Sequence, residues 1–329
     1  MNTIGFLDFA PSIHHTRIVH FLSQTYQIES YFLTHNLDKF ETRNLDALLI
    51  GELDKTIHLV KNLNLPKIGI SWARDIQGLM NNLQPSVIQG LLELDLLIVD
   101  CKYHMQNLIN FGINPRKILI FPYGVNLSKY NFYKKAHKHS NLIVYSNRSW
   151  EPGYGYETLL EAYQEYAKYS EKVEFRLAGD GSLRHKLMSK YQALFKSGKL
   201  AILGNISEDN NIEELKKSDL YISASEYDGI SVSILESMAI GTPVIVSDIA
   251  PNLEIISDGQ NGLTFNKQKS NDLIFKMSKM LNSDQKMSEF AHRSRKIVEA
   301  KANWTENMKL FSDKIAFMID NKFDVFNRD

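Results

Sequence analysis

The chain of 329 residues has few of the features that mark several large classes of protein. Its single cysteine, Cys101, excludes an internal disulfide and a cysteine-rich zinc cluster. The surrounding letters, LLIVDCKYH, are typical of the end of a strand, so we expect a buried and unreactive thiol. No uncharged apolar run reaches the ~18 residues that a membrane-spanning helix needs. The opening letters, MNTIGFLDFAP, lack a basic segment followed by a long apolar one, so we expect no signal peptide and a cytoplasmic protein.

Net charge is also lacking, because Lys plus Arg and Asp plus Glu each total 38. A balanced chain has no overall field that would favour nucleic acid, so we expect no nucleic-acid partner. Two basic segments, YKKAHKH and RHKLMSKYQALFKSGK, suit peripheral contact with the inner face of a membrane, although solvated basic faces are the default interpretation. The remaining composition, 43% hydrophobic and 23% charged, is that of a globular protein with room for two cores.

Short apolar runs alternate with helical patterns along the whole chain. In the first part the runs are TIGFLDF, LDALLIG, KIGIS, LLIVD and ILIFP, and HHTRIVHFLSQTY between them has helical spacing. After a polar and cationic stretch the pattern restarts with LIVYS, VEFRLAG, LAILG, LYISAS and PVIVSD as strands. YETLLEAYQEYAKYS, LRHKLMSKYQALF and SILESMA read as helices. Residues from about 268 to 320 are also helical, with Leu273, Met277 and Met280 on one stripe. This alternation predicts two α/β units with parallel sheets covered on both faces.

The strand-to-helix loops are where ligands bind in open parallel sheets. The loop AGDGS, residues 178–182, has Gly179 and Gly181 for a tight turn, but a simple turn is about twice as common as a ligand loop for such a pattern. The loop SNRSWEPGYG places Arg148 just after a buried strand, where a guanidinium could bind a diphosphate. A surface arginine in an ion pair is the alternative interpretation.

The stretch SEYDGISVSILESMAIGTPVIVSD, residues 225–248, carries two carboxylates at the opening of a helix. Ser231 or Ser233 is placed to cap a helix that begins near Val232, which directs its backbone amides at a ligand. Glu236, in the early turns, could accept two hydroxyl hydrogen bonds from a ribose diol. Asp228 lies before the helix, closer to whatever the phosphates carry. Two surface carboxylates, one of them favouring the helix dipole, fit the letters equally well.

Taken together, these segments resemble the retaining glycosyltransferases of family 4. Asp228-x7-Glu236 followed by GTPV is similar to the E-x7-E signature and the G-x-P-V turn of that family. PYGVNLSKY resembles its P-x-G-V-D-x-x-x-F segment, and RSWEPGYGYETLLEAY resembles R-x-x-x-x-K-G-x-x-x-L-L-x-A. LAGDGSL and SDIAPNLEIISDGQNGLTF also have counterparts. The likeness covers the carboxyl-terminal half closely and the amino-terminal half loosely, through SIHHTRIVHFL and SWARDI.

The resemblance implies a GT-B fold, in which two Rossmann-like domains face a central cleft. We expect an acceptor-side domain at 1–128, a linker at 129–140 and a donor domain at 141–305. A carboxyl-terminal helix at 306–329 would pack back on the first domain. The donor nucleotide sugar would be held mainly by the second domain, and its expected contacts are Arg148, Gly179, Asp228, Gly229, Ile230, Ser231, Val232, Ser233 and Glu236. By this likeness Arg148 faces the diphosphate, Glu236 the ribose, and Asp228 with the backbone of 229–233 the transferred sugar.

Two positions depart from the family pattern. The first acid is Asp228, one methylene shorter than the usual Glu, and Tyr154 stands where a lysine is expected beside the diphosphate. Neutralisation of the diphosphate then depends more on Arg148 and on helix amides. The likeness implies no metal, and the loops carry no aspartate pair that resembles a metal site.

The amino-terminal half offers candidates for the place where acceptor and leaving group would meet. His15 is our catalytic candidate there, beside Arg148 and Asp228, and His14, Arg17, Arg74 and Asp75 are acceptor-side candidates. A single histidine is more often a core or capping residue than a catalytic one, and two in succession at a helix start shift that balance modestly. Trp72 could be an acceptor platform, with a buried aromatic at a strand end as the equal alternative.

We therefore predict a retaining, metal-independent glycosyltransferase of the hexosyltransferase type. It would move a sugar from a nucleotide-sugar donor, as substrate rather than cofactor, to a hydroxyl of a glycan or lipid-linked acceptor, in the synthesis of surface polysaccharide or glycoconjugate. A nucleotide-sugar epimerase on the same fold would act on the donor alone. A non-catalytic nucleotide-sugar-binding partner subunit is the third hypothesis, and only the departures at Asp228 and Tyr154 favour it.

Overall fold

The computed structural model describes residues 1–81, 84–133 and 141–321, and the chain divides into two compact units. Unit 1 consists of Met1–Tyr123 and the described residues from Thr305 onward, and unit 2 is Gly124–Trp304. The predicted linker, 129–140, falls in unit 2 for residues 129–133, and 134–140 lie outside the described residues. The basic segment YKKAHKH therefore lies outside them too, except for its first residue, Tyr133.

Unit 1 contains a six-stranded sheet in the order β2-β1-β3-β4-β5-β6, and every neighbouring pair is parallel. The strands are β1 (Thr3–Asp8), β2 (Gln27–Phe32), β3 (Ala47–Ile50), β4 (Lys67–Ile70), β5 (Leu96–Val99) and β6 (Ile118–Ile120). Its helices are α1 (Ile13–Leu22), α2 (Leu53–Thr56), α3 (Arg74–Asn81), α4 (Pro85–Leu92), α5 (Lys102–Asn110) and nearly all of α14 (Trp304–Asp320), with short 3-10 turns at Leu37–Lys39, Ile57–Leu59 and Pro115–Lys117. The strands ALLI, KIGI and LLIV are buried throughout, as a parallel sheet covered on both faces requires.

Helix α14 completes unit 1 although it is the last described element of the chain. The Tyr26 hydroxyl donates to the Ser312 carbonyl at 3.2 Å, and the Asn307 amide donates to the Pro122 carbonyl at 2.6 Å. The Phe311 ring packs 5.6 Å from that of Phe121. These contacts are all within unit 1, so the chain returns to its first unit after completing the second.

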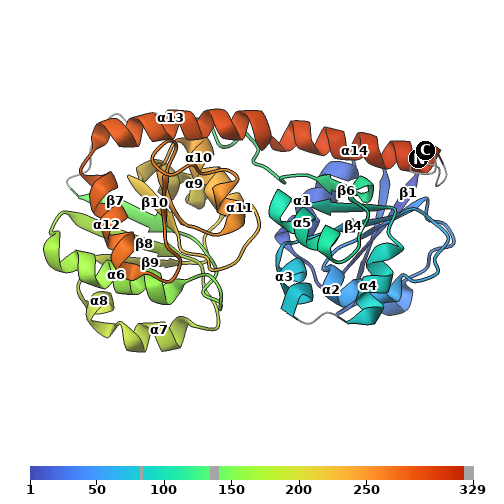
Figure 1. The fold of residues 1–329 in the computed structure, drawn as a ribbon, viewed down its shortest axis with the longest axis horizontal. Coiled ribbons are helices and arrows are strands. Elements are labelled where there is room, and N and C mark those ends of the chain that lie inside the picture. Colours follow the sequence, from blue (N-terminus) through green and yellow to red (C-terminus); the bar gives the residue numbers. More distant parts are fainter. Residues whose placement is uncertain (82–83, 134–140, 322–329) are drawn as a thin grey trace. The chain divides into compact units, whose positions relative to one another are not determined.

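Unit 2 contains the second six-stranded parallel sheet, in the order β12-β11-β10-β7-β8-β9. Its strands are β7 (Leu142–Ser146), β8 (Val173–Ala178), β9 (Leu200–Gly204), β10 (Leu220–Ser223), β11 (Val244–Ser247) and β12 (Leu263–Phe265). Its helices are α6 (Tyr156–Tyr169), α7 (Arg184–Lys190), α8 (Gln192–Lys196), α9 (Glu208–Lys217), α10 (Val232–Ile240), α11 (Ala250–Leu253), α12 (Ser270–Leu281) and α13 (Asp284–Lys301). Figure 1 shows helices on both faces of this sheet.

The expected helical stripe on α12 is confirmed, because Leu273, Met277 and Met280 are fully buried in the core of unit 2. Cys101 is buried, as expected. Two helix predictions are wrong in extent. The first helix ends at Leu22 rather than continuing to Tyr26, since a turn follows at Ser23, and LRHKLMSKYQALF divides into α7 and α8 at Tyr191. Among the described residues, no helix combines the length and apolarity needed to cross a membrane.

Candidate functional site

Each sheet has one point at which the strand order reverses. In unit 1 this point lies between β1 and β3, and in unit 2 it lies between β7 and β10. Ligands of open parallel sheets bind beyond the carboxyl ends of the strands at such points, because the loops there diverge and leave room. Arg148 follows β7, and Asp228 follows β10, so both belong to the reversal point of unit 2.

Arg148 is the centre of the polar contacts in unit 2. Its Nη2 atom donates to Oδ2 of Asp228 at 2.5 Å. Its Nη1 atom donates to the hydroxyls of Ser231 and Ser233 at 2.6 and 3.0 Å. The arginine and aspartate side chains are 14% and 13% exposed, so this ion pair is largely removed from water yet still reaches the surface. The structure thus brings together four of the predicted donor contacts.

Two tyrosines fix the orientation of Arg148 from other directions. The guanidinium carbon lies 4.5 Å from the centre of the Tyr154 ring, a cation–π contact. The Tyr156 hydroxyl donates to the Arg148 carbonyl. Burial lowers the pKa of Arg148, but the charge of Asp228 more than offsets this, so the net shift is upward. The arginine therefore remains a cation at any physiological pH.

Glu236 is held by two side chains that the sequence analysis did not select. The Tyr130 hydroxyl donates to Oε1 of Glu236 at 2.9 Å, and the Asn211 amide donates to Oε2 at 3.1 Å. A carboxylate oxygen has two lone pairs and can accept more than one hydrogen bond. The carboxylate is half-buried and its orientation is set before any ligand arrives.

The start of α10 is confirmed at Val232, but the predicted serine cap is wrong. Ser231 occupies the N-cap position and makes no side-chain capping hydrogen bond, because its hydroxyl accepts from Arg148 instead. Ser233 likewise contacts Arg148 and also Tyr221. The two serines therefore bind the arginine rather than the helix amides.

The backbone around the ion pair uses two glycines in different ways. The Gly229 amide donates to the carboxylate of Asp228 at 3.0 Å, which orients that side chain. Gly179 has a φ of +95°, and a Cβ there would lie 2.6 Å from the Arg148 carbonyl oxygen. The Gly179 amide donates to the Gly204 carbonyl at 2.7 Å. Gly179 therefore allows the Arg148 backbone to approach it closely, which a residue with a side chain would prevent.

In unit 1, His15 lies at the strand-order reversal and is 4% exposed. Its Nδ1 atom lies 3.2 Å from Asp8 Oδ2, and its Nε2 atom lies 3.0 Å from the Ser30 hydroxyl. The ring stacks on Phe6 at 4.0 Å. Both ring nitrogens are thus engaged within the unit, and the imidazole is held firmly against the end of β1.

His14, Trp72 and Tyr123 form a cluster of three rings beside His15. The His14 and Trp72 ring centres are 5.4 Å apart and nearly parallel, and Tyr123 lies 6.0 and 5.4 Å from them. His14 and Trp72 are half-buried, whereas Tyr123 is buried. A Cβ on Gly51 would lie 2.8 Å from Nε1 of Trp72, so the glycine at the end of β3 makes room for the indole.

The other acceptor-side candidates differ in exposure. Asp75 is 3% exposed, and its Oδ1 atom accepts from the Ser71 hydroxyl and the Trp72 amide, while Oδ2 accepts from the Leu53 amide. Burial raises the pKa of Asp75. In contrast, Arg74 is exposed and Arg17 is half-buried, and both have partners within the structure.

Three buried side chains near the end of β5 bear on the expectation that the chain has no metal site. Ligand atoms of Asp100, Cys101 and His104 lie within 4.8 Å of one another. His104 Nδ1 already lies 2.9 Å from Asp100 Oδ1, so the histidine and the aspartate are paired by a hydrogen bond. From the sequence, Cys101 was considered only as a buried thiol, so this grouping was not predicted.

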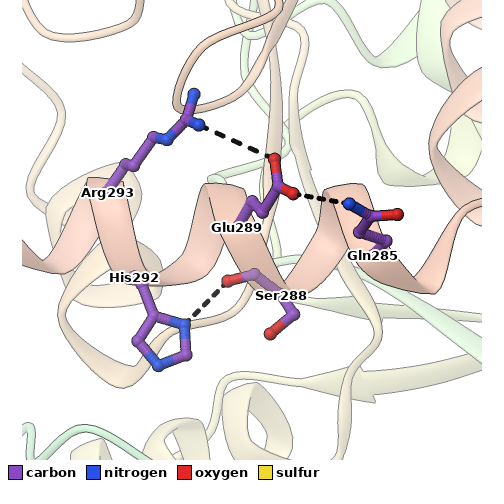
Figure 2. A pocket seen from close by; sticks show the side chains of 5 residues that line it. All are labelled: Gln285, Ser288, Glu289, His292 and Arg293. Atoms are coloured by element: carbon purple, nitrogen blue, oxygen red, sulfur yellow. Dashed lines mark hydrogen bonds and ion pairs between the residues drawn. The ribbon is translucent and has the colours of Figure 1, made fainter.

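A pocket on unit 2 lies away from the candidate residues. Figure 2 shows the five exposed side chains of α13 that line it, among which Glu289 contacts Gln285 and Arg293. His292 Nδ1 lies 2.8 Å from the Ser288 carbonyl. These contacts, one helical turn apart, are ordinary for a solvated helix face. None of the predicted site residues lines this pocket, so we assign it no ligand.

A signal for the missed contact of Glu236 was present in the sequence. The segment PYGVNLSKY resembles P-x-G-V-D-x-x-x-F, in which the last position is Phe, whereas this chain has Tyr130. An added hydroxyl on a buried ring usually has a hydrogen-bond partner. Asn211 and Tyr221, by contrast, lie in stretches with no motif, and only the fold brings them to the site.

Comparison with known proteins gives consistent results. The family model described as glycosyl transferases group 1 matches residues 129–297, just over half of the chain. One curated relative is the N-acetylgalactosamine-N,N'-diacetylbacillosaminyl-diphospho-undecaprenol 4-alpha-N-acetylgalactosaminyltransferase of Campylobacter jejuni, which is 22% identical over 249 residues. The match covers 73% of this chain and 65% of that relative, so the chain spans slightly less than two thirds of its length.

Two solved structures share the fold at low sequence identity. Sucrose-phosphate synthase from Thermosynechococcus elongatus has a TM-score of 0.83 and 13% identity, covering 98% of this chain and all of the other. HepE of Anabaena, solved in complex with UDP, has a TM-score of 0.77 and 14% identity, covering 96% of this chain and all of the other. The predicted GT-B class with two Rossmann-like domains is confirmed.

Proposed function

The chain belongs to the glycosyl transferases group 1 family, and we propose that it is a retaining glycosyltransferase that uses a nucleotide-sugar donor. The observation that carries this proposal is the arrangement of Arg148, Asp228 and Glu236. All three lie in the region that the family model matches and around the strand-order reversal of unit 2. One cation and one carboxylate are the groups that a diphosphate and a ribose diol require.

In this proposal Arg148 stabilises the departing diphosphate. A guanidinium held by Asp228, Ser231 and Ser233 is fixed before the reaction, so it costs little reorganisation as charge develops on the leaving group. The leaving phosphate accepts the proton of the acceptor hydroxyl on the same face, and no covalent protein intermediate is required. Glu236 accepts the ribose hydroxyls, and Asp228 with the 229–233 backbone lies beside the transferred sugar. Arg148 would serve as the cation that a metal supplies in other transferases.

We further propose that unit 1 binds the acceptor. His14 and the half-buried Trp72 offer ring faces to a sugar, and Arg17 and Arg74 offer cations to a phosphate or carboxylate of the acceptor. His15, held by Asp8, would hold the end of β1 in place beneath them. The relative from Campylobacter is named for a diphospho-undecaprenol substrate, which supports a lipid-linked glycan as the acceptor class. A lipid-linked acceptor would bring the chain to the inner face of a membrane.

A nucleotide-binding panel tests the donor half of the proposal. UDP, GDP, ADP, CDP and dTDP are each added to the full chain, and the shift in its unfolding temperature is recorded. A nucleotide at 100 times its dissociation constant stabilises the folded state by about 2.7 kcal/mol, which is readily measured. We expect one or two of the five to stabilise the chain.

Glu236→Ala gives the specific prediction. Hydrogen bonds to a charged group contribute about 1.5–3 kcal/mol each, so we expect the affinity of the stabilising nucleotide to fall tenfold or more in calorimetry. Glu254→Ala, at the end of short helix α11 in the same unit, is the matched control and should bind as the wild type does. Unchanged affinity in Glu236→Ala would refute the ribose assignment.

A further inference from the structure

A chain of hydrogen bonds joins Glu236 to Arg148 through the interior of unit 2. Asn211 Oδ1 accepts from the Asn147 amide at 2.8 Å, and the Tyr221 hydroxyl lies 2.8 Å from Asn147 Oδ1. The Asn211 amide also donates to Glu236, so these contacts run from the carboxylate through the two asparagines to Tyr221. On the far side of Tyr221, its hydroxyl oxygen lies 2.9 Å from that of Ser233, which accepts from Arg148.

The donor and acceptor roles in this chain follow from its carboxylate end. A carboxylate only accepts, so the Asn211 amide nitrogen faces Glu236 and its oxygen faces Asn147. Asn147 must then present its nitrogen to Asn211 and its oxygen to Tyr221, which donates its single proton there. The donor and the acceptor cannot be exchanged in any of these hydrogen bonds while Glu236 is ionised.

The same reasoning assigns the donor and acceptor roles in the bonds next to Arg148. Because the Tyr221 proton is already given to Asn147, the Ser233 hydroxyl must donate its proton to the Tyr221 oxygen, 2.9 Å away. The Ser231 hydroxyl, also 2.9 Å from that of Ser233, then donates to Ser233. Ser233 in turn accepts from Arg148, which only donates. Every bond therefore points the same way, from the arginine cation to the glutamate anion. Hydrogen bonds aligned in this manner polarise one another and strengthen the whole chain.

Three of the four linking side chains are shielded from water, whereas the fourth, Asn147, is half-buried. Tyr221 is fully buried, Ser233 is 9% exposed and Asn211 is 8% exposed. Water cannot readily replace a lost partner there, so each bond restrains the next side chain. The Tyr145 hydroxyl also donates to Asn211 Oδ1 at 2.8 Å, which further fixes the asparagine.

We propose that Tyr221 and Asn147 are positioning residues. They hold Arg148, which binds the diphosphate, and Glu236, which binds the ribose, in a fixed position relative to each other. This inference rests on the proposed function, since it takes Arg148 and Glu236 as the two nucleotide contacts. It adds that the affinity for the ribose end depends on Tyr221, which reaches Glu236 through Asn147 and Asn211. A nucleoside diphosphate is the ligand class that fits this arrangement, because its diphosphate suits Arg148 and its ribose suits Glu236.

Three tyrosine-to-phenylalanine variants of the full chain test the inference, because each removes one buried hydroxyl. Tyr130→Phe removes a direct donor to Glu236, and Tyr221→Phe removes the distant link. Tyr163→Phe is the control, since the Tyr163 hydroxyl is buried without a hydrogen-bond partner among the described residues. The nucleoside diphosphate that stabilises the wild type best in the five-member panel is titrated into each variant by calorimetry.

We expect Tyr130→Phe and Tyr221→Phe each to weaken binding roughly three- to tenfold, and Tyr163→Phe to bind as the wild type does. In a Glu236→Ala background, Tyr221→Phe should add little further loss of affinity, because the hydrogen-bond chain then has no carboxylate to orient. A purely structural role would give a loss that adds in full, and that result would overturn the inference. So would wild-type affinity in Tyr221→Phe.

The outcomes separate this inference from the proposed function. If Glu236→Ala weakens binding and Tyr221→Phe does not, the nucleotide site stands and the coupling through Tyr221 is refuted. If the wild type binds none of the five nucleoside diphosphates, both are refuted. Urea denaturation of each variant shows whether a change in affinity accompanies a loss of folding stability.

Discussion

At the residue scale, the two departures from the family pattern meet at one side chain. Asp228 contacts the Nη2 atom of Arg148, and the Tyr154 ring lies against the same guanidinium. A glutamate would need extra space where the aspartate now fits, and a lysine would place a second cation where the ring now lies. The contacts therefore support the view that Asp228 and Tyr154 are adapted to each other through Arg148, and that the site is intact.

The double variant Asp228→Glu with Tyr154→Lys tests this mutual adaptation. Overpacking a filled site typically costs ~1–3 kcal/mol, so we expect Asp228→Glu alone to lower donor affinity or turnover about 5- to 150-fold. Tyr154→Lys alone should also impair the chain, because it removes the ring and adds a charge beside Arg148. Together the two changes restore the family's usual pair, and we expect a smaller loss than the product of the single losses.

Kinetics with one donor on the wild type, both single variants and the double variant measure this coupling. Residues in contact show coupling free energies of about 0.5–3 kcal/mol, which is above the error of such a cycle. Asp228→Ala serves as the control for a missing acid and should be impaired. A single Asp228→Glu variant more active than the wild type would mean that the site has decayed.

At the element scale, Asp75 joins three segments of unit 1. Its carboxylate accepts the amide of Leu53, which opens α2, the Trp72 amide of the loop after β4, and the amide of Ile76 in α3. A buried carboxylate with these partners replaces the missing backbone acceptors at two helix starts. Its acceptor-side role stays a prediction from the sequence, and its contacts in the structure are those of a scaffold.

Asp75→Ala should therefore lower the stability of unit 1. Leaving several buried donors without an acceptor typically costs 2–4 kcal/mol in total, and we expect a loss of about that size in urea denaturation. Asp38→Ala, which removes an exposed carboxylate of the same unit, is the matched control and should change little. If Asp75→Ala unfolds at the wild-type urea concentration, the scaffold role is wrong.

A second carboxylate of unit 1, Asp54 in α2, gives a prediction about pH. Burial raises the pKa of Asp54 from 3.8 to about 6, and the charge of Asp75 adds to this shift. Because the folded-state pKa is above the unfolded-state pKa, the folded state binds the proton more tightly, and stability falls as pH rises from about 4 to about 7. Since Asp54 is only half-buried, solvent screening reduces the effect to roughly 1 kcal/mol.

Asp54→Asn should remove this fall. We expect the variant to match the wild type near pH 4 and to be more stable by roughly 1 kcal/mol at pH 7.5, measured by urea denaturation at both values. A difference between variant and wild type that does not change with pH would contradict the raised pKa. Asp38→Asn controls for the loss of a surface charge.

The predictable elements were those with uniform apolar strands. ALLI, KIGI and LLIV are buried throughout and were found from the sequence. Strand β2, with the sequence QIESYF, was missed because it lies at the sheet edge, where polar side chains are tolerated and no apolar run forms. Strand β12, LTF, was missed because it has only two apolar residues, whereas the equally short β6, ILI, is apolar throughout. The serine cap of α10 failed because Arg148 competes for Ser231, a contact between distant segments.

At the scale of the whole molecule, the candidate residues of each unit follow strands at or next to the point where the strand order reverses. The family motifs selected Arg148, Asp228 and Glu236 from the sequence, and these residues cluster in unit 2. The side chains that orient them, such as Tyr130, Asn211 and Tyr221, could not be selected because their contacts depend on which strands and loops become neighbours. Sequence motifs thus identified the groups that would touch a ligand, and the fold identified the groups that position them.

Retaining transfer from a nucleotide sugar can be tested without knowledge of the natural acceptor, by donor cleavage with water in its place. The chain is incubated with UDP-sugars and GDP-sugars whose sugar is α-linked to the diphosphate, and the first released sugar is followed by proton NMR, with Glu236→Ala as the control. We expect that one donor is cleaved, that the released sugar is initially the α-anomer, and that Glu236→Ala slows its release at low donor concentration. Initial release of the β-anomer, or conversion of the donor to an epimer with its diphosphate still attached, would contradict it.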